Sequence, residues 1–227
     1  MDDVFVLFRI GPLAITTTVA TTWLIMAALG GACWLATRRL SDDPGLAQTV
    51  LEGVVGAIDD AIRAVLPHRA EVVLPFVGTL WIFIVAANLA GLVPGLSSPT
   101  ADLSATAGLA MLVFLSVHWF GIRADGLREY LRHYLRPSPI LLPFHVIGEI
   151  TRTVALAVRL FGNVMSLELA ALMVLLVAGL LVPVPLLMLH IVEALVQAYI
   201  FGMLALVYIS GAMQSHHFAQ AQERSNA

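Results

Sequence analysis

Arg159 lies in the middle of one of the most apolar stretches of the chain, residues 153–163. A guanidinium keeps its charge at physiological pH, so Arg159 cannot adapt to a lipid-like medium by losing a proton. An arginine at the centre of a bilayer costs about 2.5–3.5 kcal/mol on insertion scales, and such residues usually mark functional sites. The sequence therefore predicts a fixed positive charge that meets a negative charge inside a membrane. The structural alternative is an ion pair within the chain, with Glu168 or Glu193.

Arg152 and Asn163 are predicted to share a helix face with Arg159. Each residue of an α-helix advances by about 100°, so residues four and seven apart lie on one side. Glu168, nine residues after Arg159, falls on the opposite side and is better placed to line a separate cavity. A buried amide in a membrane can also simply bridge helices, so a structural role for Asn163 stays open.

A second polar cluster follows in the last apolar segment. His190, Glu193 and Gln197 are spaced i, i+3 and i+7, which places them on one face of a helix. In an antiparallel pair of helices, this spacing brings Gln197 opposite Arg159, where the amide oxygen could accept a guanidinium hydrogen bond. His190 and Glu193 also resemble a pair of metal ligands, although two ligands without a third are a weak signal.

A third cluster precedes Arg159, because His145, Glu149 and Arg152 repeat the spacing i, i+4 and i+7. We interpret them as candidates for the inner mouth of an ion path. The structural alternatives are that His145 is an interfacial residue that does not titrate, and that Glu149 only anchors the end of a helix.

Together these residues predict an ion path that is interrupted in its middle. Carboxylates and imidazoles can pass on protons or coordinate small cations. A fixed guanidinium repels cations and prevents a continuous ion path between the two sides of the membrane. The titratable groups form an outer set of Glu168, His190 and Glu193 and an inner set of His145 and Glu149, with Arg159 between them. We expect the three outer groups to share one water-filled cavity.

The composition is that of a membrane protein. Of the 227 residues, 59% are hydrophobic and 12% are charged, against about 25% charged residues in a soluble domain. The mean hydropathy is +0.91. The net charge of −3 argues against a nucleic-acid partner, and the single cysteine, Cys33, excludes an intramolecular disulfide.

The uncharged runs predict an all-α, polytopic membrane protein, because about 20 apolar residues suffice to span a bilayer. Five membrane-embedded helices are expected, and the last two are too long for a perpendicular crossing, so they should form a strongly tilted antiparallel hairpin. The expected helices span about 13–36, 73–93, 102–121, 140–180 and 184–213.

Two connecting segments, 46–65 and 123–136, are amphipathic and are predicted to lie as helices in the membrane interface. Asp102 or Thr100 is a plausible N-cap for the third membrane helix. We expect a single membrane domain. Its parts are an outer segment 1–12, peripheral helices and interfacial segments 13–136, the ion-path hairpin 137–215 and an inner tail 216–227.

The arginines predict the orientation of the chain. Segments 37–71 and 123–136 carry four arginines each, whereas the connections 94–101 and 178–185 carry none. Because basic residues are retained on the cytoplasmic side, the N-terminus should lie outside and the C-terminus in the cytoplasm.

The sequence from Arg159 to Asn163, Arg-Leu-Phe-Gly-Asn, together with Glu168 and the run from His190 through Gln197, closely resembles subunit a of the rotary F-type ATP synthases. Pro-Phe-Val-Gly-Thr-Leu at 75–80 and Asn-Leu-Ala-Gly-Leu-Val-Pro at 88–94 also look like that family. The resemblance covers about residues 13–213.

The resemblance implies a stator subunit that provides two offset half-channels for H⁺ or Na⁺. These would serve the carboxylates of a rotating ring of c subunits, with Arg159 as the essential arginine and Gln197 as its neighbour across the helix pair. Asn163, Glu168 and His190 match outer half-channel positions, whereas Glu193 lies outside the common pattern. The short N-terminus and Val-Met-Ser-Leu at 164–167 resemble a divergent, sodium-linked (N-type) branch.

The resemblance further implies an ATP synthase complex in a bacterial inner membrane, with b-type peripheral stalk subunits as additional partners. The chain has no phosphate-binding loop, so we expect no ATP hydrolysis by this chain itself and no cofactor. A self-contained secondary transporter or channel is the alternative, but it would usually show internal repeats and discontinuous helices. A membrane metalloprotease would need more ligands than His190 and Glu193.

Overall fold

The computed structural model describes residues 6–10, 13–38, 45–67, 69–93, 96, 98–128, 130, 142–178 and 183–225. Long helices dominate these residues, which confirms the predicted all-α class. Five of the helices are long and apolar enough to cross a membrane. Half of the second interfacial segment, 123–136, lies outside the described residues. Its first three residues, 123–125, belong to the end of the third membrane helix instead of a separate interfacial helix.

A short antiparallel hairpin precedes the first helix. Strand β1 (Val6–Ile10) pairs with β2 (Leu13–Thr16), with Ile10 opposite Leu13. Helix α1 (Thr17–Thr37) therefore begins four residues later than predicted. The reason is local, because the β-branched residues Ile15 and Thr16 suit a strand that has a partner to pair with.

Helix α2 (Leu46–Val65) confirms the first amphipathic segment. Its second half packs Ile58 and Ile62 against the core, whereas apolar residues of its first half, such as Val50 and Val54, stay exposed. A helix with an exposed apolar face of this kind suits the boundary between lipid and water.

The second and third membrane helices are α3 (Ala70–Ala90) and α4 (Leu103–Asp125). The 3₁₀ turn η1 (Pro99–Ala101) precedes α4, whose N-cap is Asp102, as predicted. The Asp102 carboxylate accepts hydrogen bonds from the backbone and the hydroxyl of Ser104 and from Thr18 of α1. Asp102 thus joins α1 to the start of α4.

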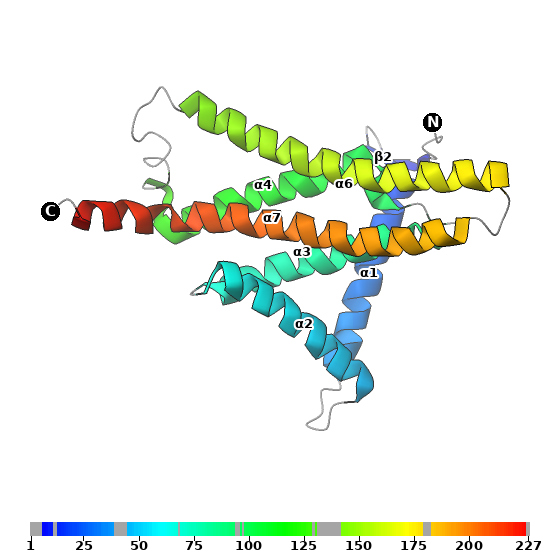
Figure 1. Ribbon diagram of the computed structural model, residues 1–227, viewed down its shortest axis with the longest axis horizontal. Helices are drawn as coiled ribbons and strands as arrows, with labels where there is room; N and C mark the ends of the chain where they lie inside the picture. The colour runs from blue at the N-terminus through cyan, green and yellow to red at the C-terminus, as the bar shows by residue number, and fades with distance from the viewer. Residues whose placement is uncertain are drawn as a thin grey trace.

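The two longest helices are α6 (Leu142–Ala178) and α7 (Pro183–Ser225). Figure 1 shows them antiparallel along the longest axis of the molecule, as the predicted hairpin requires. Helix α7 continues through most of the segment expected to be an inner tail. α4 packs against both helices of the hairpin and α3 packs against α7.

The core lies where α2, α3, α4, α6 and α7 meet. Small residues allow the helices to approach closely there, because lipid offers no hydrophobic drive for helix association and close packing must replace it. Ala198 and Ala205 of α7 are fully buried. The largest fully buried apolar side chains are Phe201, Ile62, Ile84, Leu160, Leu206 and Ile209.

Candidate functional site

Arg159 is exposed on the outward face of α6, while its neighbours Leu156, Ala157 and Leu160 are buried against the core. Leu156 and Leu160, four residues apart, share one side of the helix, whereas Arg159 is rotated by about 100° from Leu160. Among the described residues, no carboxylate forms an ion pair with Arg159. The alternative of an internal ion pair is thus not found, and the guanidinium is directed away from its own chain.

Asn163, one turn further along α6, faces α7. Its Nδ2 donates a hydrogen bond to Oε1 of Gln197 at 2.7 Å. Gln197 is only 2% exposed, and its Nε2 is buried and finds no hydrogen-bond partner in the described part of the chain.

The expected hydrogen bond between Gln197 and Arg159 is replaced by this amide pair. Four residues advance an α-helix by about 40° more than one full turn. That rotation brings Asn163 round toward α7, while Arg159 stays on the exposed side. The bridging alternative for Asn163 is therefore what the structure contains.

His190 of α7 is buried against the end of α3. Its Nε2 lies 3.2 Å from the backbone carbonyl oxygen of Asn88. A carbonyl oxygen only accepts hydrogen bonds, so Nε2 carries the proton in the neutral imidazole. Nδ1 is then the nitrogen that can accept a further proton.

Asn88 is a residue that the sequence analysis did not assign to the site. It is fully buried, its Nδ2 donates to the carbonyl oxygen of Ala194 at 3.3 Å, and its Oδ1 accepts from Thr100 at 2.7 Å. Ser98 lies 2.7 Å from the Thr100 hydroxyl and donates to Ala87 O at 2.9 Å. An asparagine near the end of an otherwise apolar helix was the available signal.

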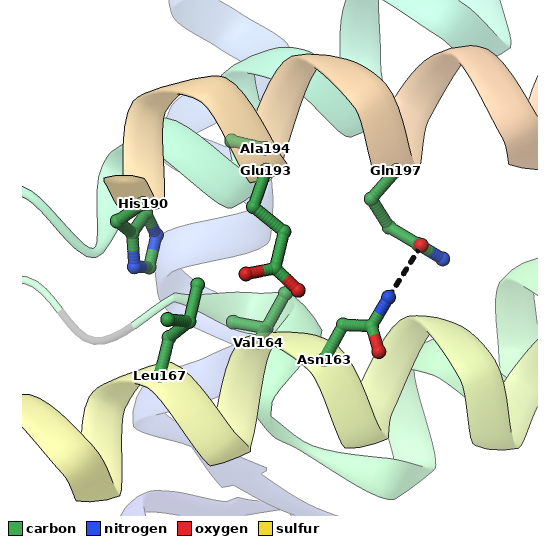
Figure 2. Close-up of a pocket in the computed structure, with 7 residues that line it drawn as sticks. All are labelled: Asn163, Val164, Leu167, His190, Glu193, Ala194 and Gln197. Carbon is green, nitrogen blue, oxygen red and sulfur yellow. Dashed lines mark hydrogen bonds between the residues drawn. The ribbon is translucent and has the colours of Figure 1, made fainter. Parts of the chain in front are cut away.

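Glu193 points into the small space between α6 and α7. Figure 2 shows its carboxylate reaching toward α6, between His190 and Asn163, while Nε2 of Gln197 points away from it. The cavity measures about 10 Å³, close to the lower limit for one water molecule. It is lined by Asn163, Val164, Leu167, His190, Glu193, Ala194 and Gln197.

The structure adds no third ligand to His190 and Glu193, the pair that resembles metal ligands, among the described residues. Within the described residues, no group of three or more histidine, cysteine, aspartate or glutamate side chains could hold a metal ion. The two side chains share the small cavity instead, where a carboxylate and an imidazole can exchange protons.

Glu168 does not line this cavity. The expectation that it shares one cavity with His190 and Glu193 is therefore wrong. Glu168 lies on the side of α6 opposite Arg159 and faces the end of α3 and the residues before η1. Its Oε1 would lie 3.1 Å from a Cβ atom placed on Gly91. Glu168 of α6 therefore lies against the end of α3, whereas Glu193 of α7 lies between α7 and α6.

The inner candidates lie along the first half of α6. His145 is exposed and Glu149 is half-buried, and each has further interactions within the molecule. The guanidinium of Arg152 lies 5.4 Å from the ring centroid of Tyr208 on α7. Such a cation–π contact holds the charge of Arg152 against α7.

Comparison with known proteins connects this arrangement to one family. Residues 19–210 match the family model of the ATP synthase A chain. The chain is 71% identical over 209 residues to ATP synthase subunit a 2 of Pelobacter propionicus, covering 92% of each chain. It is 59% identical over 217 residues to ATP synthase subunit a of Legionella pneumophila (strain Corby), covering 95% of this chain and 94% of the relative.

A third relative is ATP synthase subunit a 1 of Hahella chejuensis, with 63% identity over 206 residues that cover 91% of this chain and 88% of the relative. The family model's match, residues 19–210, covers nearly the whole of the five candidate membrane spans, which run from Thr17 to Met213. The chain therefore belongs to the ATP synthase A chain family, that of subunit a of the F-type ATP synthases.

Proposed function

We propose that this multi-pass membrane subunit provides the two ion half-channels of its ATP synthase and separates them with Arg159. The observation that carries the proposal is the position of Arg159, a permanent cation exposed on an apolar helix and without an ion pair among the described residues. Such a charge is expensive in a membrane unless a partner supplies a negative group.

The ring of c subunits is the proposed partner at this surface. Only 11% of the most apolar part of α6 is buried within the chain, compared with 44% for α3. An apolar helix surface of this extent, with Arg159 at its middle, suits a neighbour that presents apolar helices and a carboxylate. Exposed apolar side chains of α6 before and after Arg159 include Val154, Val158, Met165 and Leu169. Arg152, two turns before Arg159, is exposed as well.

The outer half-channel is proposed to use Glu168, His190, Glu193 and the amides of Asn163 and Gln197. The cavity of His190 and Glu193 supports this, since it places groups that bind protons or cations beside buried amides. The inner half-channel is proposed to use His145 and Glu149, with Arg152 held over Tyr208.

The charge of Arg159 would then drive the exchange of ions. A nearby cation favours the ionised form of a carboxylate, so a ring carboxylate releases its ion as it approaches Arg159. After passing, it reloads from the other half-channel. Each monovalent ion that crosses 100 mV contributes about 2.3 kcal/mol, so several ions are needed for each ATP.

The b-type peripheral stalk is the further proposed partner. A groove of about 920 Å³ lies between α1, α3 and α4, and apolar side chains such as Trp23, Met26 and Leu112 line it. Its apolar lining suits a membrane helix of the stalk.

We further place the N-terminus outside and the C-terminus in the cytoplasm of a bacterial cell, with the subunit in the inner membrane. The arginines of segments 37–71 and 123–136 support this orientation. In Figure 1, strand β2 and the start of α7 lie toward one end of the molecule and the end of α7 at the other.

Ion flux into vesicles separates this proposal from a self-contained transporter. The whole ATP synthase should take up ions when ATP is added, and the purified chain alone should not move ions under any imposed gradient. Coupled transport by the chain alone would contradict the stator function. Repeating the uptake in sodium-free buffer, with a pH-sensitive dye, identifies the ion.

A further inference from the structure

Gly91 is the residue directly after α3, and its backbone does not require a glycine. Its φ of −64° and ψ of −14° lie in the right-handed helical region, which every residue type adopts readily. The reason for a glycine here is therefore space rather than backbone freedom.

The space beside Gly91 is occupied by the carboxylate of Glu168. A Cβ atom at position 91 would lie 3.1 Å from Glu168 Oε1, 3.2 Å from Ser98 Cβ and 3.8 Å from the carbonyl oxygen of Asn88. By contrast, a Cβ atom on Gly56 of α2 or Gly211 of α7 would meet nothing within 4 Å. A single Cβ atom at 91 would require these neighbours to shift slightly, and a larger, branched side chain would need the place that the carboxylate holds.

The opposite wall of this space is rigid. Ser98 is 2% exposed and is held by its hydrogen bonds to Ala87 O and Thr100. Thr100 is held in turn by Asn88. Because buried groups with several hydrogen bonds resist displacement, an added side chain at 91 would displace Glu168 rather than Ser98.

The same end of α3 also holds the other outer titratable group. The carbonyl oxygen of Asn88 lies opposite Nε2 of His190 and lines the space beside Gly91. Glu168 of α6 and His190 of α7 therefore converge on the last turn of α3.

We propose that Gly91 is a positioning residue for the outer half-channel, which fixes the Glu168 carboxylate against the end of α3 that His190 also contacts. The inference rests on the proposed function of Glu168 in the outer half-channel. It adds that the ion path depends on the absence of a side chain at the uncharged residue that follows α3.

A compensating pair of substitutions tests this. Gly91→Val should lower the initial rate of ATP synthesis driven by an imposed ion gradient by about tenfold or more, because displacing a group by about 1 Å can cost 10²-fold. Gly91→Ala should have a smaller effect, seen mainly as a higher outer ion concentration for half-maximal rate. Gly56→Ala is the matched control and should behave like the parent.

Rescue distinguishes positioning from a general loss of structure. Glu168→Asp withdraws the carboxylate by one methylene, so Gly91→Val with Glu168→Asp should be at least about threefold faster than the product of the two single effects predicts. Assembly of each complex is checked on native gels. An additive or worse double variant, or a Gly91→Val enzyme with the parent's ion dependence, would overturn the inference.

Glu168→Gln separates this inference from the function beneath it. If Glu168→Gln transports ions normally, the outer half-channel assignment fails and the inference fails with it. If Glu168→Gln blocks transport but Glu168→Asp gives no rescue, only the role of Gly91 is overturned.

Discussion

Asn163 of α6 and Gln197 of α7 join the two longest helices through one side-chain hydrogen bond of 2.7 Å. The pair lies one helical turn from Arg159 and beside the cavity that contains His190 and Glu193. Both side chains are neutral amides, so the link holds the hairpin together without compensating the charge of Arg159. That charge therefore stays available to a partner.

Gln197→Glu is expected to damage coupled transport more than Gln197→Asn, although glutamate is closer in size. Glutamate can still accept the hydrogen bond from Asn163, but it adds a second carboxylate beside Glu193 in the same small cavity, and a buried charge without a positive partner is costly. We expect ATP-driven ion uptake to fall by about tenfold or more, equivalent to about 1.4 kcal/mol. Uptake by Gln197→Glu at the parent's rate would show that this position tolerates a charge.

Gly202→Ala is expected to destabilise the contact between α3 and α7. A Cβ atom on Gly202 would overlap the indole of Trp81. This indole is stacked on the ring of Tyr199, with 5.9 Å between the ring centroids, and its Nε1 donates to the Tyr199 carbonyl oxygen at 3.3 Å. Overpacking of this kind typically costs about 1–3 kcal/mol. Thermal unfolding in detergent should show a lower midpoint.

Two further variants make the test of Gly202 specific. Trp81→Leu should restore part of the lost stability in the Gly202→Ala background, because the smaller side chain makes room. Gly211→Ala, on the same helix and with nothing within 4 Å of its Cβ position, should be neutral. Equal losses for Gly202→Ala and Gly211→Ala would refute the overlap.

The hydrogen bond from Thr18 of α1 to Asp102, the N-cap of α4, ties these helices together and is expected to be sensitive to acid. Partial burial alone would raise the pKa of its carboxyl, but hydrogen bonds from Ser104 and Thr18 hold the pKa below its ordinary value. The tie thus contributes stability above about pH 4, the unfolded value, and loses it as the pH falls through the lower folded pKa. Unfolding midpoints of parent and Asp102→Asn should converge at low pH, and a constant difference would contradict this.

Cysteines in place of His190 and Glu193 should react with polar thiol reagents added from the outside, in a chain with Cys33→Ser. The reason is that both positions line the same cavity, in the part of α7 assigned to the outer side. A cysteine at His145 should react from the inside and serves as the control. The reverse pattern would overturn the proposed orientation.

Much of the fold follows from the sequence, because uncharged length and helical periodicity are local properties. They predicted the five membrane helices, the amphipathic α2 and the opposite directions of Arg159 and Glu168. The hairpin before α1 was missed, since a strand needs a partner that composition does not reveal. The partner of Gln197 was also missed, because about 40° of helix rotation decides between Arg159 and Asn163.

The outer network of Asn88, Ser98 and Thr100 could not be predicted for a related reason. These residues belong to α3 and the segment around η1, and they meet His190 only through packing between segments far apart in sequence. The close contact between the space beside Gly91 and the Glu168 carboxylate likewise depends on the packing of α6 near the end of α3, which the sequence does not reveal.

The most direct test compares two arginines of α6 in the whole ATP synthase. Arg159 is exposed on the apolar face without an ion pair among the described residues, whereas Arg152 lies over Tyr208 at 5.4 Å, a contact worth about 0.5–1 kcal/mol at exposed sites. ATP-driven ion uptake into vesicles should be abolished by Arg159→Ala and only reduced by Arg152→Ala. Normal coupled uptake with Arg159→Ala would contradict the account.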